Sequence, residues 1–150
     1  MILGIGCDSI DILRIAKLFD RFPEKFMDKI LCLHEKTALS PCGPRSALIH
    51  TLAKRFAAKE ACFKAVGTGL RQGMSWHDVA IHHTPFGAPQ LTLSGQTLRH
   101  AETLLAQQTE PSTDVTMTGT LLKPRLKTWV SISDTPHSAM AMVVLEAVFP

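Results

Sequence analysis

Hydrophobic side chains recur at helical spacing through the middle of the chain. Over residues 45–66 they fall on one face of a helix, at Leu48, Ile49, Leu52, Phe56, Phe63 and Val66. Glu60 and Lys64 lie beside this face, whereas Lys59 lies within it. Because a lysine that faces a core must either reach solvent or meet an anion, Lys59 needs a partner. The pattern predicts a long helix over 45–66 with charged groups at the edge of the core.

Shorter patterned stretches predict further helices and strands. Alternation of side chains predicts strands over 1–8, 79–82, 90–93, 129–133 and 140–149. Helical spacing predicts helices over 11–22, 23–30, 33–39 and 96–108. Since strands and helices do not alternate regularly along the chain, the fold class expected is α+β. Residues 109–127 lack a strong period, and we expect them to form a partly ordered insertion in a single domain over 1–150.

The first predicted strand places two glycines and a carboxylate on one face. Gly4, Gly6 and Asp8 alternate with larger side chains, and two glycines on one face allow another backbone to approach closely. We expect Asp8 at the end of this strand. A dinucleotide-binding loop is a weaker interpretation, because the third glycine of that motif is absent and Asp8 would repel a pyrophosphate unless a cation lay between them.

Composition restricts the classes of function. The 150 residues are 45% hydrophobic and 19% charged, with a formal net charge of +3, which suits anionic ligands or an acidic partner but does not call for nucleic acid. No apolar run is long enough to span a membrane, and the first residues lack the pattern of a secretion signal. The four cysteines lack Cys-x-x-Cys spacing, which favours free thiols. A cytoplasmic protein without membrane or nucleic-acid partners is therefore expected.

Four charged positions and a glycine-rich turn could carry chemistry. Asp8 and Glu60 could hold Mg²⁺, which usually takes one or two carboxylates together with phosphate oxygens and water. Lys59, Lys64 and the backbone of the turn at 67–69 suit phosphate oxygens. Together these groups indicate metal-assisted phosphoryl chemistry. A plainer interpretation stays open, in which Glu60 and Lys64 form an exposed ion pair and the first glycine of the turn only ends the helix.

Basic residues gather on one side of the predicted helix over 11–22. Arg14, Lys17 and Arg21 lie at helical spacing beside its apolar face. Most clusters of this kind are a solvated face. The alternative is a docking surface for an acidic protein.

Three stretches resemble the motifs of one enzyme family, the holo-acyl-carrier-protein synthases, which are the small class of 4′-phosphopantetheinyl transferases. The opening motif of the family is similar to Gly4-Ile5-Gly6-Cys7-Asp8-Ser9-Ile10, followed by Arg14-Ile15. Its second motif is similar to Arg55-Phe56-Ala57-Ala58-Lys59-Glu60-Ala61, followed by Lys64-Ala65 and Gly67-Thr68-Gly69. Its C-terminal motif is similar to Val130-Ser131-Ile132-Ser133-Asp134. The resemblance covers nearly the whole chain in the same order.

The resemblance implies an activity, a cofactor and a fold. Members of the family transfer the 4′-phosphopantetheine arm of coenzyme A to a serine of an apo-acyl carrier protein and release adenosine 3′,5′-bisphosphate. They use Mg²⁺ and act as homotrimers with active sites at the subunit interfaces. Their fold is an antiparallel sheet wrapped around a long central helix. We therefore expect coenzyme A and an acyl carrier protein as the partners of this chain.

The resemblance also implies roles for single residues. Carried over by motif, Asp8 and Glu60 are metal ligands, and Lys64 contacts the phosphate under attack. The expected contacts to coenzyme A are Gly67, Thr68 and Gly69, with Arg55, Lys59 and Asp134 as weaker candidates. The expected docking face for the carrier protein consists of Arg14, Lys17 and Arg21.

Two features depart from the family pattern, and two questions stay open. Asp134 stands where the motif often carries His, and the insertion at 109–127 is longer than is typical. Glu60, acting through a metal-bound water, is our first choice for the base that takes the serine proton, because Lys64 would need a lowered pKa for that role. The alternative function is that of a coenzyme A-binding oligomer without catalysis.

Overall fold

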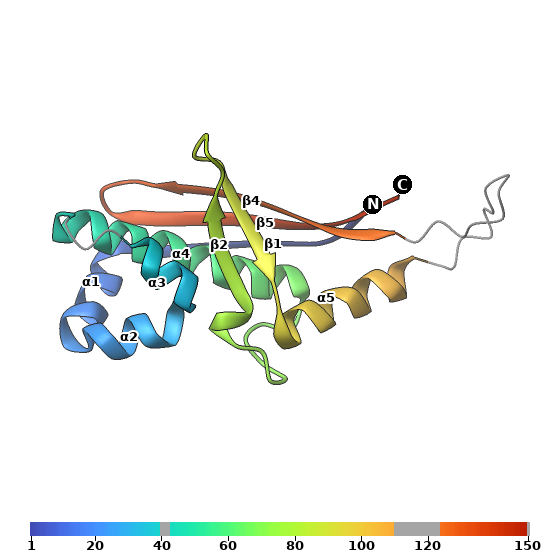
Figure 1. Ribbon diagram of the computed structural model, residues 1–150, viewed down its shortest axis with the longest axis horizontal. Helices are drawn as coiled ribbons and strands as arrows, with labels where there is room; N and C mark the ends of the chain where they lie inside the picture. The colour runs from blue at the N-terminus through green and yellow to red at the C-terminus, as the bar shows by residue number, and fades with distance from the viewer. Residues whose placement is uncertain (40–42, 110–123, 150) are drawn as a thin grey trace, which may run out of the picture.

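One long helix runs through the centre of the fold. The computed structural model describes residues 1–39, 43–109 and 124–149. In chain order the elements are β1 (Ile2–Asp11), α1 (Ile12–Arg21), α2 (Pro23–Ile30), α3 (Leu33–Ala38), α4 (Arg45–Val66), η1 (Trp76–Asp78), β2 (Val79–His83), β3 (Pro89–Leu93), α5 (Gly95–Gln108), β4 (Arg125–Asp134) and β5 (Ser138–Val148). Figure 1 shows α1, α2 and α3 towards one end of α4 and α5 towards the other. The expected α+β class is confirmed.

Helix α4 has the predicted bounds, and it is buried on more than one side. It ends at Gly67, whose φ of 87° is left-handed, as predicted for a glycine that caps a helix. Phe63 on the apolar face is fully buried, and so are Ala53 and Ala57 on the neighbouring face. The small alanines therefore leave no open space, because β1 and β5 pack against the helix. Among the described residues, no helix is both long enough and apolar enough to cross a membrane.

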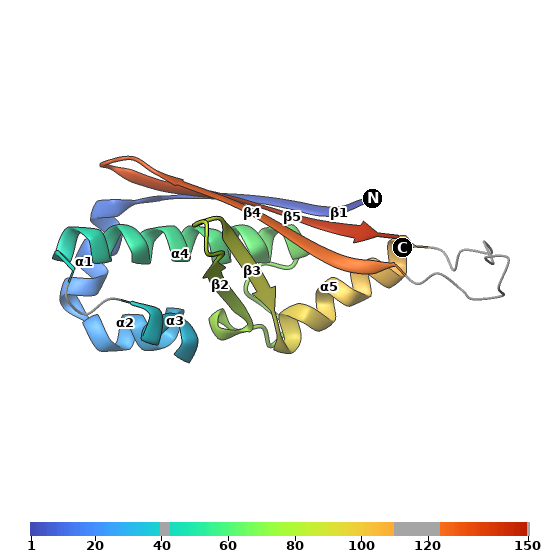
Figure 2. The ribbon, with the colours of Figure 1, turned by 45° about the horizontal axis from the view of Figure 1, so that its top comes forward.

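Two antiparallel sheets enclose α4. The first has three strands in the order β1-β5-β4, and the second consists of β2 and β3. Along β5, buried residues alternate with more exposed ones, at Ala139, Ala141, Val143, Leu145 and Ala147. Figure 2 shows the three-stranded sheet running along the length of α4. The Thr128 hydroxyl donates to the Leu91 carbonyl at 2.7 Å, which joins the two sheets.

Strand β1 approaches α4 so closely that no side chain would fit between them. A Cβ at Gly4 would lie 2.0 Å from the carbonyl oxygen of Ala65, and one at Gly6 would lie 1.9 Å from that of Ala61. The close approach predicted from the two glycines is confirmed. Asp8 is the next residue on the same face of β1, so the glycines bring its carboxylate to the surface of α4.

Three predicted bounds were too short. Asp8 is not at the end of a strand, because β1 stays paired with β5 as far as Asp11, whose carboxylate then caps α1. Strand β4 begins at Arg125 instead of residue 129, and β5 begins at Ser138 instead of residue 140, because backbone pairing continues at both places, with Val148 and Asp11 as the respective partners. Residues 110–123 of the predicted insertion lie outside the described residues.

Candidate functional site

Asp8, Glu60 and Lys64 lie together where β1 crosses α4. The Lys64 ammonium donates to Asp8 Oδ1 at 2.7 Å and to the Cys7 carbonyl at 3.0 Å. The Lys64 side chain is 50% exposed and that of Asp8 is 15% exposed. The fold therefore brings together two carboxylates and one lysine, from positions more than fifty residues apart, on a surface that a ligand can reach.

The charges of this cluster act on one another. Burial and then the neighbouring Asp8 carboxylate raise the pKa of Glu60, and the opposing attraction of Lys64 and Arg14 does not cancel this effect. The hydrogen bond to Asp8 is the main cause of a raised pKa for Lys64. Lys64 is therefore held protonated, which speaks against its use as a base. The raised pKa of Glu60 moves it toward the range in which a carboxylate accepts a proton readily.

The two carboxylates fit a metal ion that takes few protein ligands. Among the described residues, no three His, Cys, Asp or Glu side chains lie close enough to hold a metal by themselves. A pair of neighbouring carboxylates with one raised pKa is nevertheless an arrangement that a divalent cation relieves, and Mg²⁺ commonly takes one or two carboxylates and completes its shell with substrate oxygens and water.

The glycine turn after α4 opens to solvent beside this cluster. A Cβ at Gly67 or at Gly69 would meet no atom within 4 Å, and both residues have positive φ. Their backbone N–H groups, however, already donate to the carbonyls of Lys64 and Phe63. The free backbone donors that we expected there are thus used up at these two glycines. The turn is open to solvent, and Thr68 within it is partly exposed.

Lys59 and Arg55 lie in the core, and this corrects the prediction that they contact phosphates. The Lys59 side chain is fully buried, and its ammonium lies 2.5 Å from Glu35 Oε2. Arg55 Nη1 lies 2.8 Å from Glu35 Oε1, as an ion pair without an aligned hydrogen bond. Both cations are occupied by the Glu35 carboxylate, so neither faces the open site.

Glu35 is the residue that the sequence reading missed. Its pKa would be raised by burial, but the charge and hydrogen bond of Lys59 outweigh burial and lower it. Burial in turn lowers the pKa of Lys59 despite the attraction of Glu35. A signal was present in the sequence, because a core-facing Lys59 required a buried anion and Glu35 was available on a predicted helix.

Asp134 ends β4 away from the Asp8 cluster and contacts the first half of α4. Its carboxylate lies 2.7 Å from His50 Nδ1 and 3.2 Å from the Lys54 ammonium. The hydrogen bond with His50 is the main cause of its lowered pKa. Asp134 therefore pairs with side chains of the first half of α4, whereas Asp8 pairs with Lys64 near the end of that helix.

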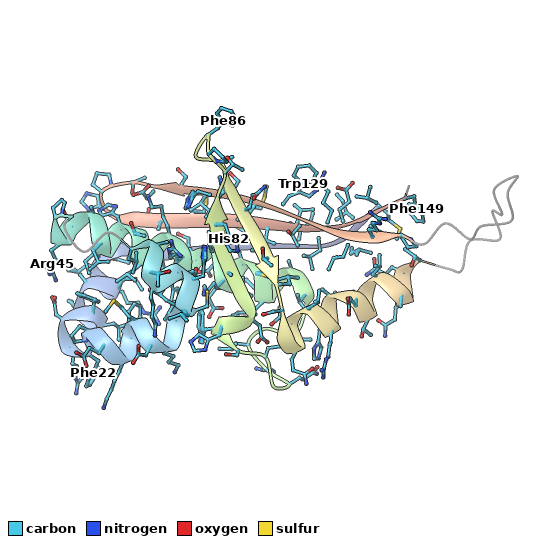
Figure 3. All side chains as sticks on the ribbon, viewed as in Figure 1. Phe22, Arg45, His82, Phe86, Trp129 and Phe149 are labelled. Carbon is cyan, nitrogen blue, oxygen red and sulfur yellow. The ribbon has the colours of Figure 1, made fainter. Side chains whose placement is uncertain are left out.

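The predicted docking residues lie on one exposed helix next to an apolar groove. Arg14, Lys17 and Arg21 are all exposed on α1, and Arg14 is close enough to lower the pKa of Glu60. The groove has a volume of about 520 Å³ and is lined by Leu18, Phe22, Lys25, Phe26, Lys29, Ile30, Phe56, Leu70 and Trp76. Figure 3 shows Phe22 where α1 meets α2.

Comparison with known families and proteins identifies relatives of this chain. A family model described as "4'-phosphopantetheinyl transferase superfamily" matches residues 4–118. The chain belongs to this superfamily. The holo-[acyl-carrier-protein] synthase of Afipia carboxidovorans is 43% identical over 139 residues, which are 91% of this chain and 99% of that protein. The enzyme of the same name from Rhodopseudomonas palustris strain TIE-1 is 41% identical over 149 residues, covering 99% of this chain and 92% of that one.

Solved structures show the same fold. The crystal structure of holo-[acyl-carrier-protein] synthase from Neisseria meningitidis has a TM-score of 0.72 and 33% identity, and the match covers 97% of this chain and 99% of that one. The Helicobacter pylori synthase in complex with coenzyme A has a TM-score of 0.68 and 29% identity, covering 95% and 99%. The family suggested by the three sequence motifs is confirmed.

Proposed function

We propose that this protein transfers the 4′-phosphopantetheine group of coenzyme A to a serine of an apo-acyl carrier protein and releases adenosine 3′,5′-bisphosphate. The relatives that carry the name holo-[acyl-carrier-protein] synthase, and the coenzyme A complex of one of them, support this assignment. The observation that carries it is the cluster of Asp8, Glu60 and Lys64 at the crossing of β1 and α4, beside the open turn at Gly67.

In the proposed reaction the serine oxygen attacks the phosphorus that bears the pantetheine, and the bond to the departing nucleotide phosphate breaks. Lys64 is protonated and half-exposed, so its ammonium can exchange Asp8 for a phosphate oxygen and stabilise negative charge in the transition state. Glu60 takes the proton from the serine through a water molecule, the role expected for it from the sequence. Positioning and charge supply most of the acceleration, as in other phosphoryl transfers.

Asp8 and Glu60 are the residues that would hold Mg²⁺. When bound, the ion would neutralise charge on the diphosphate of coenzyme A. The structural support is that two carboxylates share one small surface and that one of them has a raised pKa.

We propose that the carrier protein docks on α1 and on the groove next to it. The exposed cations Arg14, Lys17 and Arg21 suit an acidic surface. The apolar groove carries Lys25 and Lys29 in its lining, so an amphipathic acidic helix could place apolar side chains in the groove and carboxylates on the lysines.

A homotrimer is supported by an apolar face that the described chain leaves uncovered. The outer side of the three-stranded sheet exposes large apolar side chains, namely Ile5 at 58%, Trp129 at 49%, Met140 at 51% and Met142 at 48%. Contiguous patches of this kind are typical of protein interfaces. We place the enzyme in the cytoplasm as a homotrimer, and sedimentation analysis of the wild type against Met142→Glu tests the assembly.

The decisive test of the activity is direct. An apo-acyl carrier protein is incubated with this protein, coenzyme A and Mg²⁺, and the carrier mass is measured. We expect the gain of one phosphopantetheine group, which depends on Mg²⁺ and on Glu60. Binding of coenzyme A without any mass gain would instead support the non-catalytic alternative.

A further inference from the structure

The Lys59 ammonium joins three segments of the chain to α4. It donates to the Ile30 carbonyl at 2.6 Å, to Glu35 Oε2 at 2.5 Å and to the Trp76 carbonyl at 3.0 Å. These acceptors belong to the last residue of α2, to α3 and to η1. An ammonium has three donors, so all of them are satisfied, and none is free for a ligand.

Glu35 extends the same network on its other side. Glu35 Oε2 accepts the backbone N–H of Cys32 at 3.1 Å, and Oε1 accepts the N–H of Ile81 on β2 at 3.3 Å. Its side chain is fully buried. One carboxylate therefore fixes the start of α3, the middle of β2 and the Lys59 ammonium at the same time.

The segments held in this way carry the proposed docking groove. Helix α2 packs against α1 and η1, and α3 packs against β2. Phe26, Lys29 and Ile30 of α2 and Trp76 of η1 line the groove, together with Phe56 of α4. Lys59 directly precedes Glu60 on α4. The network thus joins the segments that line the groove to the helix that carries Glu60 and Lys64.

We propose that Glu35 is a positioning residue, which acts through Lys59 to hold the α2–α3 segment, and with it the carrier groove, in register with Asp8, Glu60 and Lys64. This inference rests on the proposed function. It does not give Glu35 or Lys59 any contact with substrate. Its consequence is that the network controls the use of the carrier protein more than the use of coenzyme A.

The test uses a variant that removes all three charges of the buried network, since Arg55 also pairs with Glu35. Removing one partner of a buried ionic network leaves an uncompensated charge, whereas removing every charge is far better tolerated. Glu35→Gln with Arg55→Met and Lys59→Met should therefore fold, while residue 59 no longer holds Ile30 and Trp76. We expect the KM for the carrier protein to rise at least about tenfold, because small misplacements of a docked substrate are costly, and the KM for coenzyme A to change less than about twofold.

A matched control separates positioning from general loss of stability. Leu145→Ala creates a cavity in the β5 core, away from α2 and α3, and should lower the melting temperature without changing the ratio of the two KM values. Equal increases of both KM values in the triple variant, or no change in either, would overturn the inference.

A second measurement applies to Glu35→Gln alone, below its melting temperature. Amide hydrogen exchange should accelerate over residues 23–39 and at Ile81 but not over β5. Acceleration spread evenly over the chain would argue against a local role. The proposed function fails separately, since in that case the wild type transfers no phosphopantetheine at all.

Discussion

Helix α4 carries two lysine–carboxylate pairs whose lysines are five residues apart, and they differ in almost every physical respect. Lys59 and Glu35 are both fully buried, and the ammonium is surrounded by three acceptors. Lys64 pairs with Asp8 at a similar distance, but half of the Lys64 side chain is exposed. Burial lowers the pKa of Lys59, whereas the contact with Asp8 raises that of Lys64.

The difference shows how one sequence motif can contain a structural and a chemical lysine side by side. The buried pair of Lys59 and Glu35, which we call the closed pair, has no donor left for a ligand and stabilises only the arrangement of the segments around it. In the open pair of Lys64 and Asp8, the ammonium can exchange the carboxylate for another partner, because water and a phosphate oxygen can compete for it. Two lysines of one motif, both considered for phosphate contacts from the sequence, therefore receive opposite roles from their surroundings.

Loss of a carboxylate in the open cluster should have the largest effect. Asp8→Ala and Glu60→Ala should each abolish transfer while the circular dichroism spectrum is retained, since both side chains lie at the surface of α4. The mass assay with an apo-acyl carrier protein measures this. Transfer near the wild-type rate in either variant would remove both residues from the proposed metal site.

Loss of Lys59, the lysine of the closed pair, should lower the stability of the protein. Lys59→Met leaves Glu35 buried with only Arg55 as a counter-charge, and we expect a loss of about 3–5 kcal/mol in the free energy of unfolding. Guanidinium unfolding curves provide the measurement. A loss below about 1 kcal/mol would mean that the pair is not desolvated as the structure shows.

Loss of Lys64, the lysine of the open pair, should lower the activity instead. Lys64→Met should reduce kcat by about 100-fold, because one preorganised positive charge is removed from the transition state. The melting temperature should change little, since Lys64 is half-exposed. If Lys64→Met lost stability as Lys59→Met does, the contrast between the two pairs would be wrong.

Charge reversal on the docking helix should have a smaller and selective effect. Arg14→Glu or Arg21→Glu should raise the KM for the carrier protein by about tenfold or more and leave the KM for coenzyme A nearly unchanged. Higher ionic strength should reduce the difference. Equal effects on both substrates would argue against a docking role, and Arg99→Glu on α5 provides a control of equal charge change.

The smallest effect concerns the stability of the open cluster. The pKa of Glu60 is raised, so the fold favours its neutral form and loses stability as Glu60 ionises. Glu60→Gln should therefore be slightly more stable than the wild type at pH 7, by less than about 1 kcal/mol or about 2–4 °C, although it is inactive. The difference should vanish below the ordinary glutamate pKa of 4.5. Melting curves between pH 4 and 8 measure the difference, and a Glu60→Gln variant less stable than the wild type at pH 7 would contradict the raised pKa of Glu60.

The sequence by itself determined the elements and much of the site. Side-chain periodicity and the turn residues defined α4 and its glycine cap, because local geometry decides both. The glycines of β1 predicted the close approach to α4, since the lack of a side chain is visible in the sequence. Three motifs, the first of which contains Asp8, indicated the family that the comparisons confirm.

Only the tertiary structure decided which charged groups meet. Lys59 and Lys64 differ by whether α2, α3 and η1 close over them, and that depends on contacts between segments distant along the chain. For the same reason Glu35 could not be chosen as the partner of Lys59 from spacing alone. Pairing with β5 likewise extended β1 beyond Asp8, because backbone hydrogen bonds to a distant strand do not depend on side-chain pattern.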